Sequence, residues 1–363
     1  MNAPDPATDM DIHPRKQDGT VSIRQRVFSF RTLLAFGIAV AFIFFLVTRF
    51  DLDWSATWEN VRGMNPWLYL MAFLLYYASF IFRGARWRLL AQNAGLHNSA
   101  ESRLPSAVQS ASLIIIGWFV NSITWLRMGD AYRAYAFAED SRGSFSWSLG
   151  TILAERVMDM ATIFVILVLS VLLLAYVADL TASTGIIIAA SLMAFGLLVL
   201  TLIMKFYGAR LARFLPNRFE TSYNRFQEGT LGSFKQLPLL FALGLAGWLM
   251  EIARLYFVIE ALGLSISWPL VPIVALGHAI LSTVPTPGGL GVVEPGIIGI
   301  LSLSLERHDA VSIALVDRSI TYVSVILVGG LIFLLRQATG KRRRRHQESL
   351  AHHVKGQRNA IDT

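Results

Sequence analysis

The chain of 363 residues is 54% hydrophobic but only 15% charged, with a mean hydropathy of +0.52 and a net charge of +8. Soluble globular chains carry about 25% charged residues, so this composition argues against a soluble enzyme. The chain contains no cysteine, which excludes disulfides, thiolate catalysis and cysteine-ligated zinc. We expect neither a metal nor a cofactor.

The two ends of the chain are polar. Residues 1–30 lack the apolar core and small-residue cleavage site of a signal peptide, and we expect a disordered cytoplasmic arm. Residues 31–338 hold the apolar runs of a membrane domain, and residues 339–363 form a basic tail. The KRRRR run at Lys341–Arg345 follows the last apolar run directly, so we expect it to contact lipid headgroups rather than nucleic acid.

Six apolar runs are long enough to cross a bilayer, which takes about 20 residues of helix. The predicted crossings are Thr32–Thr48, Gly63–Phe82, Met160–Ala178, Thr184–Met204, Leu237–Val258 and Ser319–Leu335. Two further apolar stretches are interrupted. Leu104–Leu126 carries Gln109 and Asn121, and Trp268–Ser304 is cut by the sequence PTPGGLGVVEPG. The expected fold is therefore an all-α polytopic membrane protein with about six full transmembrane helices and two broken helical elements.

The placement of basic residues predicts how the two interrupted stretches enter the membrane. If both crossed fully, the lysines and arginines would be split almost evenly between the two faces. If both are re-entrant and enter from opposite faces, one face holds all of the 32 basic residues except Arg49, Arg62, Arg254, Arg307 and Arg318. The positive-inside rule favours the second arrangement, with both termini in the cytoplasm and the protein in the cytoplasmic (inner) membrane. Paired interrupted segments of this kind indicate an alternating-access site.

The densest polar motif is the break in Trp268–Ser304. Prolines and glycines end a helix and permit backbone conformations closed to other residues, and a carboxylate follows them. We expect this motif to line a cavity or gate, although a break needed only for packing is an alternative. Its members are Pro285, Pro287, Gly288, Gly289, Gly291 and Glu294.

Charged residues next to Leu104–Leu126 form a second cluster. Glu155 and Asp159 lie four residues apart on one helical face, so their negative charges repel each other unless nearby cations neutralise them. The cluster could bind substrate or could be a salt-bridge network that positions the first broken element. Its members are Arg127, Asp130, Arg133, Glu155, Arg156 and Asp159.

Arg83 and Arg86 share a helical face, and the planar fork of arginine suits an anionic headgroup such as a phosphate. Simple snorkelling to the interface is the alternative. We expect Arg83, Arg86, Arg127, Asp130 and Arg133 to bind the headgroup.

Ionisable residues inside apolar runs complete the predicted cavity. Glu251 and Arg254 lie three residues apart within one crossing, where they could line the path of the substrate or merely neutralise each other. His278 could relay protons or be an ordinary hydrogen-bonding residue. Arg318, adjacent to Asp317, could partner the broken region.

Four segments together resemble the lysylphosphatidylglycerol synthase transmembrane family, often called flippase-like. They are Arg83-Gly-Ala-Arg86-Trp, Arg127-Met-Gly-Asp130-Ala-Tyr-Arg133, Glu155-Arg156-Val-Met-Asp159 and Pro285-Thr-Pro-Gly-Gly-Leu-Gly-Val-Val-Glu294. The sequence departs from the family pattern at Trp125, where members often have proline.

The resemblance implies a membrane domain that moves a lipid, or a lipid-linked molecule, between leaflets. The chain ends soon after its last predicted crossing, so we expect no aminoacyl-transfer domain and no synthase activity. Two alternatives stay open. One is an integral membrane transferase that uses Glu155, Asp159 or His278 on a polyprenyl-like, sterol-like or phospholipid substrate. The other is a non-catalytic subunit that partners a lipid-biosynthetic enzyme.

Overall fold

The computed structural model describes residues 54–95, 103–178 and 217–339, together with a few positions between 195 and 203. Throughout these ranges the secondary structure is helical, with no strand. The predicted crossing Thr32–Thr48, most of the crossing Thr184–Met204, the N-terminal arm and the basic tail lie outside the described residues.

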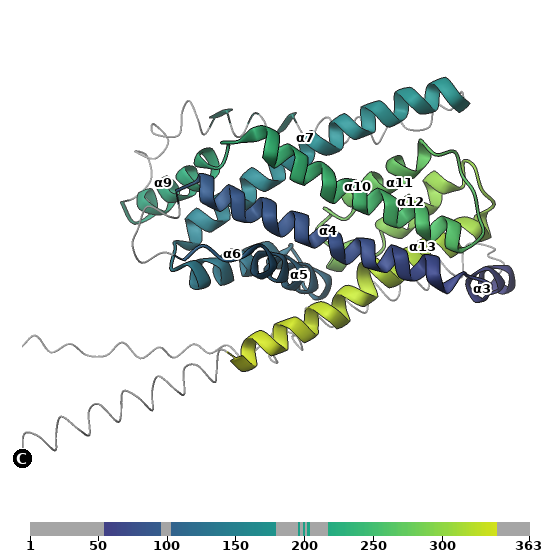
Figure 1. Ribbon diagram of the computed structural model, residues 1–363, viewed down its shortest axis with the longest axis horizontal. Helices are drawn as coiled ribbons and strands as arrows, with labels where there is room; N and C mark the ends of the chain where they lie inside the picture. The colour runs from purple at the N-terminus through teal and green to yellow at the C-terminus, as the bar shows by residue number, and fades with distance from the viewer. Residues whose placement is uncertain are drawn as a thin grey trace, which may run out of the picture.

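Four helices are long and apolar enough to cross a membrane, which confirms the predicted class of an all-α polytopic membrane protein (Figure 1). The last of them begins as α13, passes through the π-helical turn η3 and continues to Thr339. The four are α4 (Pro66–Asn93), α7 (Phe145–Ala178), α10 (Leu237–Ala261) and the helix that starts with α13 (Arg307–Arg318) and η3 (Ser319–Val323).

The remaining helices are shorter and fill the space beside these four. Two of them, α3 and α9, flank the bundle at opposite ends in Figure 1. The shorter elements are α3 (Trp54–Arg62), α5 (Ala107–Ile123), α6 (Met128–Ser141), α9 (Asn217–Gly232), α11 (Leu270–Leu281), η2 (Pro287–Gly289) and α12 (Val293–Leu301).

Helices α4 and α10 run side by side through the middle of the fold (Figure 1). The α4 helix begins at Pro66, where the side chain of Asn65 caps the free amides of the first turn. Three large aromatic side chains of α4, Tyr76, Phe80 and Trp87, are fully buried. The centre of the bundle is therefore built around a helix whose inner face is aromatic.

Three long helices extend past their predicted bounds. We expected crossings at Gly63–Phe82, Met160–Ala178 and Ser319–Leu335, each ending or starting next to charged residues. In the structure α4 continues beyond Phe82 to Asn93, α7 starts at Phe145, and the last helix starts at Arg307. The charged residues do not end these helices because most of them find partners inside the bundle, so the helices stay regular where the hydropathy falls.

The first interrupted stretch, Leu104–Leu126, holds a continuous helix, α5, which ends at Ile123 and forms a hairpin with the following helix α6. A capping box between Ser106 and Gln109 starts α5, and the chain turns back through Leu126 and Arg127, which have φ values of 59° and 52°. The two arms meet at glycines, since a Cβ on Gly129 would overlap the carbonyl oxygen of Gly117. The amide of Gly129 also donates to the Asn121 side chain at 2.8 Å.

The second interrupted stretch is broken at the predicted motif. Helix α11 ends at Leu281, the short turn η2 follows, and α12 starts at Val293. Gly288, Gly289 and Gly291 all have positive φ, at 58°, 73° and 79°. Other residues rarely adopt these conformations, so the glycines are what allows the chain to reverse here.

Replacing Gly129 by alanine should lower the thermal unfolding midpoint of the purified protein, because the α5–α6 hairpin must separate to admit the methyl group. Overpacking of this kind typically costs about 1–3 kcal/mol. Gly299→Ala is the matched control, since its methyl group would meet no atom within 4 Å. Equal midpoints for the two variants would show that the hairpin does not depend on the close approach.

Candidate functional site

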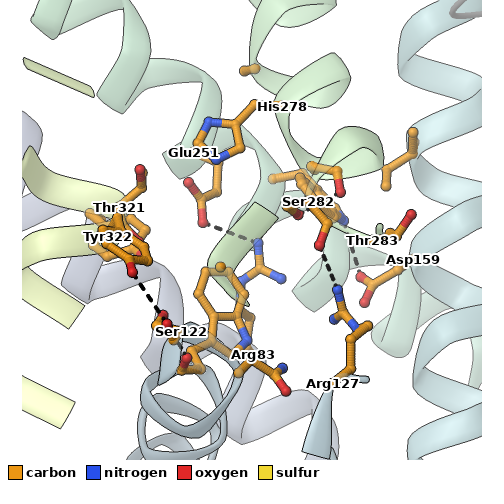
Figure 2. Close-up of a pocket in the computed structure, with 18 of the residues that line it drawn as sticks. Arg83, Ser122, Arg127, Asp159, Glu251, His278, Ser282, Thr283, Thr321 and Tyr322 are labelled. Atoms are coloured by element: carbon orange, nitrogen blue, oxygen red, sulfur yellow. Dashed lines mark hydrogen bonds and ion pairs between the residues drawn. The ribbon is translucent and has the colours of Figure 1, made fainter. Parts of the chain in front are cut away.

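A cavity of about 360 Å³ lies where the two broken elements meet the long helices. Its wall draws on α4, α5, α6, α7, α10, α11, η2, α13 and η3, and Figure 2 shows ten of its residues by name. Cations outnumber anions in this wall, even with histidine neutral. The charged lining residues are Arg83, Arg127, Arg156, Arg254, Arg318, Asp130, Asp159 and Glu251.

One ion-pair network runs along the cavity wall, and Figure 2 labels three of its members, Arg83, Glu251 and His278. Glu251 is 3.3 Å from Arg83 of α4 and 3.1 Å from Arg254 of its own helix. Arg254 in turn pairs with Asp317, whose second oxygen is 3.0 Å from Nδ1 of His278. The predicted pair of Glu251 and Arg254 is thus two members of a chain that links α4, α10, α11 and α13.

Aromatic rings hold Arg83 at the cavity wall. Its guanidinium carbon lies 5.4 Å from the ring centre of Trp118 and 4.7 Å from that of Trp248. A cation over an indole face is stabilised by about 0.5–2 kcal/mol. Arg83 is therefore fixed by a carboxylate and two rings, and it keeps a pre-organised position next to the cavity.

A second network centres on Asp130 of α6. Its carboxylate lies 3.0 Å from Arg156, 3.3 Å from Arg133 and 3.6 Å from Arg127. Burial acts to raise the pKa of Asp130, but the three guanidiniums outweigh it and hold the pKa below its usual range. Asp130 is therefore ionised at neutral pH and anchors the start of α6 to α7.

Two further arginines lie behind the cavity wall. Arg86 and Asp159 are 2.7 Å apart and each side chain is 1% exposed, and Trp248 donates from Nε1 to the same carboxylate at 3.1 Å. Arg133 and Glu155 form a pair at 3.2 Å with exposures of 0% and 3%. Arg86 and Arg133 therefore do not line the cavity, contrary to the expectation that they bind a headgroup. Their geometry fits the alternative reading, in which buried pairs position the elements around the cavity.

The Pro-Gly break is held by the last helix. Arg318 is 2.8 Å from Glu294 and donates to the carbonyl oxygen of Gly288 at 2.9 Å. Glu294 also accepts from the amide of Gly291 at 2.8 Å, so this carboxylate closes its own turn. Within this motif Gly288 lines the cavity, whereas the other members shape the backbone behind it, namely Pro285, Pro287, Gly289, Gly291 and Glu294.

The two broken elements touch each other at the cavity. Arg127, at the turn between α5 and α6, donates from Nη1 to the carbonyl oxygen of Ser282 at 2.8 Å. Tyr322 of η3 donates to the carbonyl oxygen of Ser122 at 3.3 Å, and its ring lies next to Gly288. Both contacts appear as dashed lines in Figure 2. The structure thus brings together the two motifs that the sequence separates by more than a hundred residues.

Several cavity residues were not predicted. Trp248 precedes Glu251 by three positions and shares its helical face, so the spacing could have identified it. Trp118, Ser282 and Tyr322 carry no local signal, because their position depends on packing between distant segments. Within the described ranges no three histidine or carboxylate side chains gather as metal ligands.

Removing Arg86 should destabilise the protein strongly, because Asp159 would lose its best-placed partner in a buried site. Breaking a buried ion pair costs about 3–5 kcal/mol, whereas replacing both partners by apolar residues is often neutral. We therefore expect Arg86→Met to lower the unfolding midpoint and the double variant Arg86→Met/Asp159→Leu to recover much of the loss.

Glu306→Gln is the control for this comparison of the single and double variants. Glu306 forms an exposed pair with His308, and its own side chain is 81% exposed, so its loss should leave the midpoint unchanged. Additive losses from the two buried substitutions would contradict a coupled pair.

The chain resembles known membrane proteins over most of its length. The family described as the lysylphosphatidylglycerol synthase TM region matches residues 32–329. A UPF0104 membrane protein of Methanocaldococcus jannaschii, MJ1078, is 30% identical over 227 residues, which cover 60% of this chain and 94% of that protein. A second, PH1989 of Pyrococcus horikoshii, is 26% identical and covers 73% of this chain and 86% of its own length. The chain is thus a multi-pass membrane protein that belongs to the lysylphosphatidylglycerol synthase transmembrane-region family.

Proposed function

We propose that the protein moves a lipid with an anionic headgroup between the leaflets of the cytoplasmic membrane. The observation that carries the proposal is a charged cavity, enclosed by two broken helices, in the middle of an apolar helical bundle. Ionisable residues at membrane depth cost free energy, so a polar cavity there indicates a functional role. Passage of a polar headgroup through the hydrocarbon region would be such a role.

The size of the cavity fits a headgroup rather than a whole lipid. Small-molecule sites have volumes of about 300–1,000 Å³, and this one has about 360 Å³. The acyl chains would then stay in the bilayer beside the protein. The family description, which refers to the membrane region of a lipid synthase, also supports a lipid as the substrate.

The charge of the lining favours an anion. Five arginines and three carboxylates line the cavity, and guanidinium groups bind phosphate oxygens with two parallel hydrogen bonds. Arg127 and Arg156 are the most exposed of the five cavity arginines, with side chains 28% and 25% exposed. We assign first contact with the headgroup to these two, and deeper contact to Arg83 and Arg254.

The broken elements would provide access from the two membrane faces in turn. Helices α5 and α11 have 17 and 12 residues, too short for a full crossing of about 20 residues. We place them as re-entrant elements from opposite faces, with the termini in the cytoplasm, as the distribution of basic residues suggests. The contacts of Arg127 with Ser282 and of Tyr322 with Ser122 then form a gate that opens to admit cargo from a lipid-biosynthetic enzyme.

Replacing Arg127 by glutamine should reduce inter-leaflet movement of fluorescent phosphatidylglycerol in reconstituted vesicles by about 10-fold or more. A hydrogen bond to a charged group contributes about 1.5–3 kcal/mol. The Arg127 side chain is 28% exposed, so its replacement should leave the fold intact. Movement is measured by reduction of the label in the outer leaflet with dithionite.

Arg88→Gln is the matched control, since Arg88 carries the same charge on the exposed face of α4. It should leave movement unchanged. Equal rates for empty vesicles and for vesicles with the wild-type protein would overturn the proposal.

A further inference from the structure

We infer that His278 is a proton-binding site and that an anionic headgroup and a proton bind the cavity together. The inference rests on the proposed function and adds the ion that accompanies the lipid. His278 lies on α11, within the second broken element, and lines the same cavity as the arginines. Its side chain is 12% exposed, so it is reachable from the cavity but otherwise enclosed.

The surroundings of His278 orient its ring. Nδ1 lies 3.0 Å from a carboxylate oxygen of Asp317, which is itself fully buried. A carboxylate next to Nδ1 favours the neutral tautomer that carries its proton there, and Nε2 then keeps a lone pair. His278 lines the cavity, so a ring nitrogen that carries no proton can accept one from it.

The charges around His278 oppose a proton when the cavity is empty. Asp317 already pairs with Arg254, so a protonated ring would be a second cation on one carboxylate. The charged groups that surround or share the cavity with His278 are Arg83 from α4, Arg127 and Asp130 at the start of α6, Arg156 and Asp159 from α7, Glu251 and Arg254 from α10, Glu294 from α12, and Asp317 and Arg318 from α13. Each carboxylate of this set is already paired with an arginine, so none is free to balance a new positive charge.

An anionic headgroup changes this balance. Seated against Arg83, Arg127 or Arg254, a phosphate would offset the positive potential of the wall, and His278 could then take up a proton. Binding of the anion and binding of the proton favour each other by the same factor, as linkage requires. The loaded cavity would carry one negative charge from the lipid and one positive charge from the proton. A proton gradient would then drive net lipid movement in the direction in which protons flow.

The test measures proton uptake on lipid binding, without requiring transport. Dihexanoyl phosphatidylglycerol is a suitable probe, because it is water-soluble and its phosphodiester stays ionised at neutral pH. Its binding to the purified protein is followed by calorimetry at pH 7 in two amine buffers of different ionisation enthalpy. The difference in heat gives the number of protons taken up.

We expect the wild-type protein to take up close to one proton for each lipid bound, and its affinity to fall by up to 10-fold per pH unit above neutral. His278→Gln should bind the probe with almost no uptake and little dependence on pH. His308→Gln should behave like the wild type, since His308 lies at the start of α13 and does not line the cavity.

Binding without proton uptake by the wild-type protein, or equal uptake by His278→Gln, would overturn the inference. Absence of saturable binding would also overturn it. Each of these outcomes is separate from the vesicle assay, in which lipid movement by the wild-type protein decides the proposed function. If the wild-type protein moves lipid but takes up no proton on binding it, the proposed translocase function stands and the coupling to protons is wrong.

Discussion

The structure depends on the pairing of charges inside an apolar bundle. An ionised side chain taken out of water costs several kcal/mol unless a partner is well placed. Here one continuous chain of pairs, from Arg83 through Glu251 and Arg254 to Asp317, joins three helices that are far apart in sequence. The pairing fixes where these helices meet, because sliding one of them would leave a buried charge without its partner. The apolar contacts of the bundle do not fix the positions of the helices along their axes in the same way.

The cavity follows from this arrangement. Charged side chains from α4, α7, α10 and α13 face one another there, and the two broken elements fill the space between these helices only in part. Trp248 connects the halves of the site, since its ring lies over Arg83 while its Nε1 donates to Asp159. Asp159 also lies 3.8 Å from Arg156 of the Asp130 network, so the two charge networks are in contact through Trp248 and Asp159. A change of charge in either network alters the surroundings of the other.

The sequence was sufficient to predict the class of fold, the position of the Pro-Gly break and most charged residues of the site. These predictions depend on local properties, namely run length, helix-breaking residues and charge inside apolar segments. The helices α4, α7 and the last helix extend past the predicted crossings, because hydropathy falls at Arg83, Glu155 and Arg318 although the helices continue. Partners from other helices, which no local pattern reveals, hold these residues in the bundle. For the same reason the burial of Arg86 and Arg133 behind the wall could not be foreseen.

The strength of the contacts differs between the wall of the cavity and the junction of the broken elements. The wall is held by carboxylates paired with arginines, whereas Arg127 and Tyr322 reach across the junction to the backbone carbonyls of Ser282 and Ser122. The bond from Tyr322 joins two neutral groups and is roughly half as strong as a charge-assisted one, and the bond from Arg127 joins a guanidinium to a neutral carbonyl rather than to a carboxylate. Parting at the junction therefore strands no buried carboxylate, and the acceptors persist whatever side chains occupy positions 122 and 282. In the proposed gate these contacts are the ones that would break and re-form, while the ion pairs of the wall stay in place.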